Sequence, residues 1–219
     1  MGQEIDLLRN YPKTKRDLTG RAKGKSEVDR AVARRFGKEF FDGSRDHGYG
    51  GFSYQARFWQ PVIPDLVDHF QLTAASSVLD VGCAKGFMLF DLAQALPGIH
   101  VRGVDISEYA VDQAKPEVRD CLEVADAASL PFGDNSFDAV ISVNTVHNLD
   151  EEGCAQALGE IQRVSRGKSF ITVDAYRNDQ ERERMEMWNL TALTIKSVDD
   201  WIRFFKDVGY TGDYYWFIP

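Results

Sequence analysis

Residues 78–87 read Val-Leu-Asp-Val-Gly-Cys-Ala-Lys-Gly-Phe, and this stretch decides the fold. The apolar run predicts a buried strand with Asp80 at its end, and a loop with Gly82 and Gly86 leads from it into a helical pattern. Glycine allows dihedral angles closed to other residues and lets a backbone come close to a ligand. Since open parallel sheets bind ligands at the carboxyl ends of their strands, we expect this loop at a binding site.

From Ser77 onward, short β-rich runs alternate with helical patterns, which is typical of a parallel α/β sheet. The predicted strands are 77–81, 100–104, 122–124, 137–143, 169–173 and 214–218. The predicted helices are 26–41, a short one after Pro61, 87–96, 107–115, 151–164, 180–193 and 198–208. The chain thus divides into a basic arm with a helical and aromatic cap, residues 1–73, and a core, residues 74–219.

The second predicted strand leads into Asp105 and Ile106, where a carboxylate can accept hydrogen bonds from both hydroxyls of a ribose. Enzymes that use NAD also place an acidic residue at this point. The spacing of the glycine loop therefore has to distinguish an NAD site from a site for S-adenosylmethionine. The dinucleotide fingerprint is G-x-G-x-x-G, whereas the loop here is D-x-G-x-x-x-G with Asp80 before its first glycine. A carboxylate is badly placed beside a pyrophosphate but well placed near a cationic methionyl ligand. The spacing therefore favours S-adenosylmethionine over NAD.

A third element agrees with this choice. Asp126 and Ala127 follow the third predicted strand, where a carboxylate can accept from an adenine amino group and a backbone N–H can serve a ring nitrogen. Taken alone, each match has an ordinary explanation as a tight turn, a helix-entry charge or a turn residue. Their order and spacing together indicate a nucleoside site.

These motifs make residues 74–176 resemble the class I S-adenosylmethionine-dependent methyltransferases of the small-molecule branch. The resemblance lies in the segments VLDVGCAKG, GVDIS, VADA, LPFGDNSFDAVIS and VNTVHNLD. It implies an α/β, Rossmann-like fold whose mostly parallel twisted sheet has the order 3-2-1-4-5 plus a last strand, with helices on both faces. It also implies S-adenosylmethionine as cofactor and S-adenosylhomocysteine as product.

By the same resemblance, the cofactor site is assigned in parts. The methionyl part falls to Asp80, Gly82, Cys83 and Gly86, the ribose to Asp105 and Ile106, the adenine to Asp126 and Ala127, and the sulfonium side to Asn144. Two departures stand out: Ala84 occupies a position where the family usually has glycine, and one strand remains where the family's sheet normally ends in an antiparallel hairpin. Residues 46–64 and 209–219 also resemble a bacterial subgroup associated with surface-polysaccharide sugar biosynthesis.

Methyl transfer from a sulfonium is an in-line displacement in which proximity does most of the work. An oxygen or nitrogen acceptor can also need a base, and His147 beyond the fourth strand suits that role, with a packing histidine as the alternative. Asp174 at the end of the fifth strand is expected to orient or deprotonate the acceptor, unless it only caps the following turn. Candidate acceptor-binding residues are Tyr49, Tyr54, Arg57 and Tyr176, and the first two belong to an aromatic segment that covers the cleft or simply packs the cap.

Charge and composition limit the possible partners. Residues 1–40 carry eleven cations and six anions, so with a net charge of -8 the remainder carries -13, which argues against a broad nucleic-acid footprint. The three cysteines have no Cys-x-x-Cys spacing, and no run of about 18 apolar residues occurs, so we expect a cytoplasmic protein without a metal or membrane contact. A small-molecule acceptor is the expected partner, and the oligomeric state stays open.

Three alternatives stay open beside this interpretation. An NAD-type oxidoreductase is disfavoured by the loop spacing. A non-catalytic S-adenosylmethionine-binding partner or regulator would keep the cofactor loop and lack an acceptor pocket. An RNA methyltransferase would use the basic N-terminal arm, although the sequence after the fourth strand, Asn144-Thr-Val-His, is not the Asn/Asp-Pro-Pro-Tyr used on amino groups of nucleic-acid bases.

Overall fold

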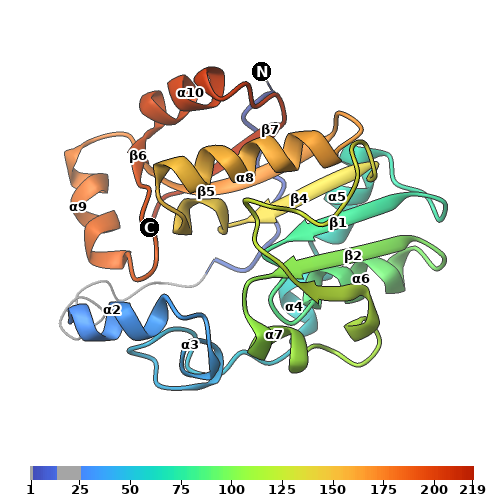
Figure 1. Cartoon of the computed structure of the whole chain (residues 1–219), viewed down its shortest axis with the longest axis horizontal. Coiled ribbons are helices and arrows are strands. Elements are labelled where there is room, and N and C mark those ends of the chain that lie inside the picture. Colours follow the sequence, from blue (N-terminus) through green and yellow to red (C-terminus); the bar gives the residue numbers. More distant parts are fainter. Residues whose placement is uncertain (1, 14–25) are drawn as a thin grey trace.

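The computed structural model describes residues 2–13 and 26–219, and its centre is a twisted parallel sheet (Figure 1). The strands are β1 Ser77–Val81, β2 His100–Asp105, β3 Leu122–Val124, β4 Ala139–Val143, β5 Ser169–Tyr176, β6 Lys196–Ser197 and β7 Asp213–Phe217. They have the order β3-β2-β1-β4-β5, with β7 beside most of β5 and the short β6 beside its carboxyl end. The predicted order 3-2-1-4-5 plus a last strand is confirmed.

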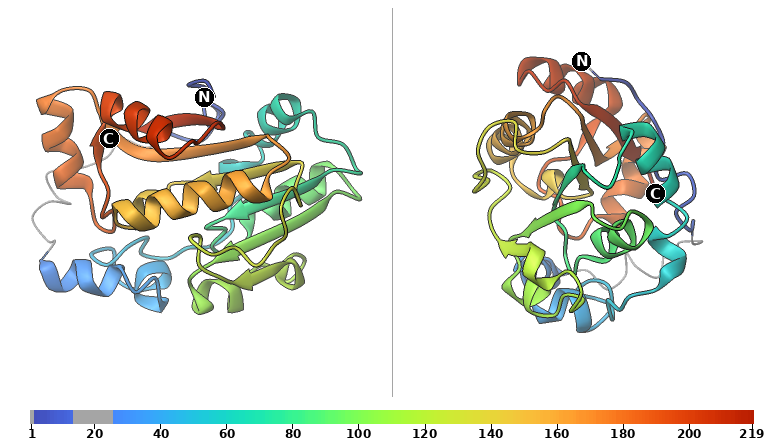
Figure 2. Two further views of the ribbon diagram at one scale, coloured as in Figure 1. Left: turned by 45° about the horizontal axis from the view of Figure 1, so that its top comes forward. Right: turned by 90° about the vertical axis from the view of Figure 1, so that its right-hand side faces the viewer.

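Helices cover both faces of the sheet (Figures 1 and 2), and each face has its own hydrophobic cluster. One cluster includes α8 Glu151–Val164 and α10 Val198–Asp207, and the other includes α5 Ile63–Phe70 and α6 Phe87–Ala95. Successive side chains of a strand point to opposite faces, so Val78 enters the second cluster and Leu79 the first. Burial on both faces explains why the central strands β1 and β4 are nearly continuous apolar runs.

The last strand does not form the antiparallel hairpin that is usual in the resembled family. All strand pairs in the described part of the chain are parallel, and β7 pairs directly with β5 from Phe170 opposite Asp213 to Asp174 opposite Phe217. The outer edge of β7 is partly covered, because Glu4 forms a parallel bridge to Tyr214. The departure noted in the sequence is therefore real, and a segment from the start of the chain lies where a further strand would pair.

The single helix predicted over 26–41 is wrong. The structure has α2 Glu27–Ala33 and α3 Lys38–Asp42, separated at Phe36, whose φ of 48° is left-handed. The apolar stripe continues across this break, so periodicity alone could not detect it. The predicted start is confirmed, because Ser26 and Asp29 form a capping box.

Other boundaries differ by short stretches. The helix predicted over 107–115 is the shorter α7 Glu108–Asp112, and Lys115, which precedes Pro116, lies outside it as expected of a residue before proline. The helix predicted over 180–193 is α9 Asp179–Trp188, and residues 189–195 form an irregular segment in which the Asn189 side chain accepts the Ala192 N–H. Short 3-10 turns at Arg119–Cys121 and Val146–Asn148 and the strand β6 were not predicted.

The described start of the predicted basic arm packs into the core. Leu7 is 4% exposed and lies in the same cluster as Ile63 and Val78, while the Arg9 guanidinium pairs with Asp65 of α5. Residues on both sides of the predicted boundary at residue 73 thus share one hydrophobic cluster. The short helix α4 Ala56–Trp59 completes the cap, and residues 14–25 of the predicted arm lie outside the described residues. In the described part of the chain, no helix is long and apolar enough to cross a bilayer.

Candidate active site

The loop after β1 lies at the carboxyl end of the sheet and is tied to β2. The backbone N–H groups of Gly82 and Cys83 both donate to the Val104 carbonyl, at 2.7 and 3.0 Å. The Ala84 N–H donates to Oδ2 of Asp105 at 2.8 Å. The end of β2 therefore accepts hydrogen bonds from three consecutive N–H groups of the loop. These bonds hold the carboxyl ends of β1 and β2, which the sequence motifs indicated, in one site.

Gly82 lies where no side chain fits. Its φ is 85°, and a Cβ built on it would lie 2.0 Å from Oγ1 of Thr145 and 2.7 Å from its Cβ. Ala84 also has a left-handed φ, 49°, which explains why related loops favour glycine at this position. The alanine keeps the same backbone path at a conformational cost of about 1–2 kcal/mol.

Two buried carboxylates, Asp80 and Asp105, lie beside this loop. Burial, together with the smaller effect of the nearby Asp105 charge, raises the pKa of Asp80 to about 8. Burial also raises the pKa of Asp105, although hydrogen bonds from the backbone N–H groups of Ser107 and Ala84 oppose that effect. A cationic ligand would stabilise the ionised form of Asp80, so the donor set suits the methionyl end of S-adenosylmethionine.

Apolar side chains are exposed beside the acidic ones. Ile106 after β2 is 55% exposed and Val124 at the end of β3 is 46% exposed, so both leave apolar surface uncovered at the carboxyl ends of neighbouring strands. Asp126 is exposed nearby, and its Oδ1 accepts the Ala128 N–H at 2.9 Å, as a turn residue would. This arrangement fits a flat aromatic base. Val124 was missed by the sequence analysis, although its signal was an apolar residue at the very end of a strand.

Asn144, at the end of β4, is held across the sheet by Thr172 of β5. The Thr172 hydroxyl donates to Oδ1 of Asn144 at 2.8 Å, and the Asn144 N–H donates back to that hydroxyl at 2.9 Å. Asn144 has a left-handed φ of 54°. Asn148 follows in the next turn and donates to the Asn144 carbonyl at 3.3 Å, and sequence reasoning did not single it out.

His147 and Asp174 are in contact and buried. Nδ1 of His147 accepts the Asp174 backbone N–H at 3.3 Å, and Nε2 lies 3.5 Å from Oδ1 of Asp174. Burial lowers the pKa of His147, although the Asp174 charge opposes this. Because Nδ1 is an acceptor, the proton of the neutral ring lies on Nε2 and faces Asp174. The ring is thus arranged to hold Asp174 in place.

The lowered pKa of His147 gives a pH-dependent stability with a definite sign. The neutral ring contributes its full stability above pH 6.5, and this contribution is lost as the pH falls through the lowered folded-state pKa. Wild-type free energy of unfolding, measured by urea titration between pH 7.5 and 5.5, is expected to fall by up to about 1 kcal/mol per pH unit through this group. His147→Gln should flatten the slope, whereas His100→Gln, on an exposed histidine, should not. Equal slopes for all three proteins would contradict the assignment.

The predicted acceptor-binding residues do not all gather at the strand ends. Tyr49 packs against the ring of Phe52 at 4.4 Å, and Arg57 lies exposed over the ring of Phe58. Tyr54 donates its hydroxyl to Asp91 of α6 at 2.5 Å, so its contacts lie on that helix and not beside His147. Tyr176 ends β5, opposite Ser197 of β6.

The remaining expected site residues lie in the glycine loop. Cys83 is buried, its thiol pKa is raised well above the ordinary value by burial, and Gly86 starts α6 with a φ of 72°. Among the described residues, no group of three or more side chains could hold a metal ion. The glycine loop thus contributes its backbone conformation to the site, and the charged groups of the site are the carboxylates of Asp80 and Asp105.

A doubly wound parallel sheet with a glycine loop after β1 and carboxylates near the ends of β1 and β2 is typical of nucleotide-cofactor-binding α/β proteins. Residues 78–168 match the family model described as a methyltransferase domain. The predicted resemblance to class I S-adenosylmethionine-dependent methyltransferases is confirmed, because the matched residues contain the motifs that carried it. This family uses S-adenosylmethionine as methyl donor and produces S-adenosylhomocysteine.

Relatives share the domain and differ in what their names describe. The chain is 30% identical to a tRNA (carboxymethyluridine(34)-5-O)-methyltransferase of Arabidopsis thaliana, over 60% of this chain and 31% of that protein. It is 27% identical to the 27-O-demethylrifamycin SV methyltransferase of Amycolatopsis mediterranei, over 66% of this chain and 57% of that one. The YcgJ protein of Bacillus subtilis has the same fold, with a TM-score of 0.55, 19% identity and coverage of 67% and 66%. The chain spans between about a third and 57% of the length of such curated relatives.

Proposed function

We propose that this protein is a methyltransferase that transfers a methyl group from S-adenosylmethionine to an oxygen or nitrogen of a small polar molecule. The observation that carries the proposal is the buried carboxylate of Asp80 beside the Gly82 loop, with Asp105 held at the neighbouring strand end. A buried acid with a pKa of about 8 is unfavourable in the free protein and suits a cationic ligand.

The chain's own residues would hold the cofactor in three parts. Asp80 would pair with the methionyl ammonium, and Asp105 would accept from the ribose hydroxyls. Ile106 and Val124 would contact the adenine, with Asp126 and Ala127 at its polar edge, and Asn144 would face the sulfur. The cofactor, when bound, supplies an electrophilic methyl group on its sulfonium.

The acceptor would lie at the ends of β4 and β5. Asp174 would orient the acceptor hydroxyl or amine and take its proton, and His147 would hold the Asp174 carboxylate in position. A polar metabolite such as a sugar fits a carboxylate at this point, and it agrees with the resemblance of residues 46–64 and 209–219 to a bacterial subgroup associated with surface-polysaccharide sugar biosynthesis. We further propose a bacterial, cytoplasmic protein, with which the three free cysteines agree.

Two contacts of the basic segment support a small acceptor over RNA. The Arg30 guanidinium donates to the Asn189 carbonyl at 2.6 Å, and that of Arg34 donates to the Thr191 carbonyl at 3.4 Å. These cations bind the irregular segment after α9 and so hold α2 against it. Engagement inside the molecule leaves them less available for a phosphate backbone.

Calorimetric titration of the purified protein with S-adenosylmethionine, S-adenosylhomocysteine and NAD tests the proposal. We expect micromolar binding of the first two ligands and none of NAD. Binding of NAD alone would contradict the proposed methyltransferase activity and favour an NAD-type oxidoreductase. Binding of the two adenosyl ligands without methylation of any acceptor in a panel of sugars, amines and transfer RNA would favour the non-catalytic partner.

Asp105→Ala is expected to weaken S-adenosylhomocysteine binding by about 1.5–3 kcal/mol, or roughly 10- to 150-fold, because a charged hydrogen-bond acceptor is lost. The same substitution also removes the acceptor of the Ala84 and Ser107 N–H groups. Asp112→Ala, on an exposed carboxylate of α7, is the matched control and should bind as the wild type does. If Asp105→Ala bound S-adenosylhomocysteine with unchanged affinity, Asp105 would not belong to the cofactor site.

A further inference from the structure

Lys85 occupies a position within the glycine loop where the motif specifies no residue type, yet its side chain is only 9% exposed. Its Nζ donates to Oδ2 of Asp42 at 2.6 Å and to the Phe52 carbonyl at 2.8 Å. Both partners belong to the cap, on α3 and the loop that follows it. A buried ammonium requires such partners, because an unpaired buried charge is strongly unfavourable.

Asp42 is the centre of this contact. Its Oδ2 also accepts the Tyr109 hydroxyl of α7 at 2.8 Å, and its Oδ1 accepts the Phe52 N–H at 2.8 Å. Burial raises the pKa of Asp42, but the hydrogen bonds from Lys85, Phe52 and Tyr109 outweigh it and hold the pKa below its ordinary value. One ionised carboxylate thus joins α3, the cap loop, the glycine loop and α7.

A second cap contact is made by the turn after β2. The Ser107 hydroxyl donates to the carbonyl of Phe36, the left-handed residue between α2 and α3. Ser107 also donates its backbone N–H to Oδ1 of Asp105 at 2.9 Å. The cap therefore touches both the loop after β1 and the turn after β2, the two segments that would hold the methionyl part and the ribose.

We infer that Asp42 and Lys85 form a positioning pair, through which the cap holds the glycine loop in its cofactor-binding shape. The loop has three left-handed residues, Gly82, Ala84 and Gly86, and Lys85 lies between the last two. Because glycine-rich backbone has many alternative conformations, a side-chain anchor lowers the entropy lost when the ligand binds. The inference rests on the proposed cofactor site and adds two residues that do not touch the ligand.

Asp42→Asn and Lys85→Met test the inference with S-adenosylhomocysteine as calorimetric probe. Each substitution is expected to weaken binding about tenfold. Without the anchor, the glycine loop has to become ordered when the ligand binds, and this ordering reduces the net free energy of binding. Thermal unfolding is measured in parallel to separate a general loss of stability from a change at the site.

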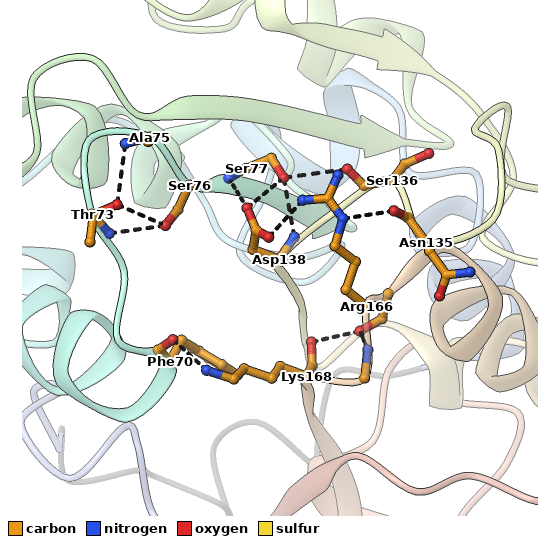
Figure 3. A network of polar contacts seen from close by, with 12 residues as sticks. Phe70, Thr73, Ala75, Ser76, Ser77, Asn135, Ser136, Asp138, Arg166 and Lys168 are labelled. Atoms are coloured by element: carbon orange, nitrogen blue, oxygen red, sulfur yellow. Dashed lines mark hydrogen bonds and ion pairs between the residues drawn. The ribbon is translucent and has the colours of Figure 1, made fainter.

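The matched control is Asp138→Asn, in a polar network at the amino ends of β1 and β4 (Figure 3). Asp138 accepts from Arg166 at 2.7 Å and from the Ser77 N–H at 2.8 Å, so it is also a carboxylate paired with a cation and a backbone donor. Ser77 begins β1, far from its carboxyl end. This variant is expected to unfold at a lower temperature while binding within twofold of the wild type.

The double variant Asp42→Asn/Lys85→Met should bind no more weakly than either single variant, because each residue acts through the other. Binding that is equal in all variants and the wild type would overturn the inference and leave the proposed function intact. Losses that multiply in the double variant, or an equal loss in Asp138→Asn, would also overturn it. Absence of binding by the wild type itself would contradict the proposed function, and the inference with it.

Discussion

Gly82→Ala is expected to abolish measurable S-adenosylhomocysteine binding and to lower the free energy of unfolding by about 2–4 kcal/mol. Two effects add at this position. The φ of 85° disfavours any residue with a side chain, and the added Cβ would lie 2.0–2.7 Å from three side-chain atoms of Thr145. Because one of these atoms is the Thr145 Cβ itself, no rotation of that side chain relieves the contact. The loop or the end of β4 has to move.

Gly167→Ala separates the two effects. Gly167 has a φ of 100°, but a Cβ built there would meet nothing within 4 Å. Gly167→Ala should therefore lower the free energy of unfolding only through the unfavourable backbone conformation, by about 1–2 kcal/mol, and leave the ligand affinity unchanged. Urea unfolding and calorimetric titration of both variants make the comparison. If Gly82→Ala bound the ligand like Gly167→Ala, the close approach of the loop to β4 would be unimportant for the site.

Asp80→Asn is expected to change stability and binding in opposite directions. The variant should bind S-adenosylhomocysteine at least about 30-fold more weakly, because the ammonium loses a charged partner. It should also be more stable than the wild type at pH 9, by about 3 kcal/mol, because an ionised carboxylate no longer has to be buried. A site residue that destabilises the free protein is the pattern expected where function opposes stability.

The pH dependence follows from the pKa of about 8 in the folded protein and the ordinary value of 3.8 for an aspartate. Between these values the folded wild type keeps a proton on Asp80 that the unfolded chain has lost, so its stability falls as the pH rises toward 8. The stability gain of Asp80→Asn should therefore grow from pH 5 to pH 8 and then level off. Linkage limits this growth to about 1.4 kcal/mol per pH unit.

Ligand binding provides an independent readout of the same carboxylate. If the ligand requires ionised Asp80, wild-type affinity should rise up to about tenfold per unit between pH 6 and 8, and binding should release a proton. Calorimetry at pH 7 in two buffers of different ionisation enthalpy measures that proton. A variant that is less stable at pH 9, or that binds as tightly as the wild type, would contradict the role of Asp80.

Local patterns were enough for the parallel sheet and for the cofactor loop. Strand and helix signals extend over a few neighbouring residues, and an acid followed by spaced glycines constrains the backbone wherever it occurs. The helix predicted over 26–41 failed because its apolar stripe continues past Phe36, whose left-handed conformation is stabilised by contacts with Ser107, 71 residues away. Periodicity records which face is apolar and does not record a turn within that face.

What the sequence by itself determined is the class of the domain and the strand ends that carry its carboxylates. The tertiary structure alone decided which distant groups meet there. The Thr145 side chain lies close to Gly82, and Asp42 pairs with Lys85, 43 residues away in the sequence. The His147 ring contacts Asp174. The physical reason is that hydrogen-bond partners and close approaches across the fold depend on packing between elements, whereas dihedral preferences and side-chain periodicity act along the chain.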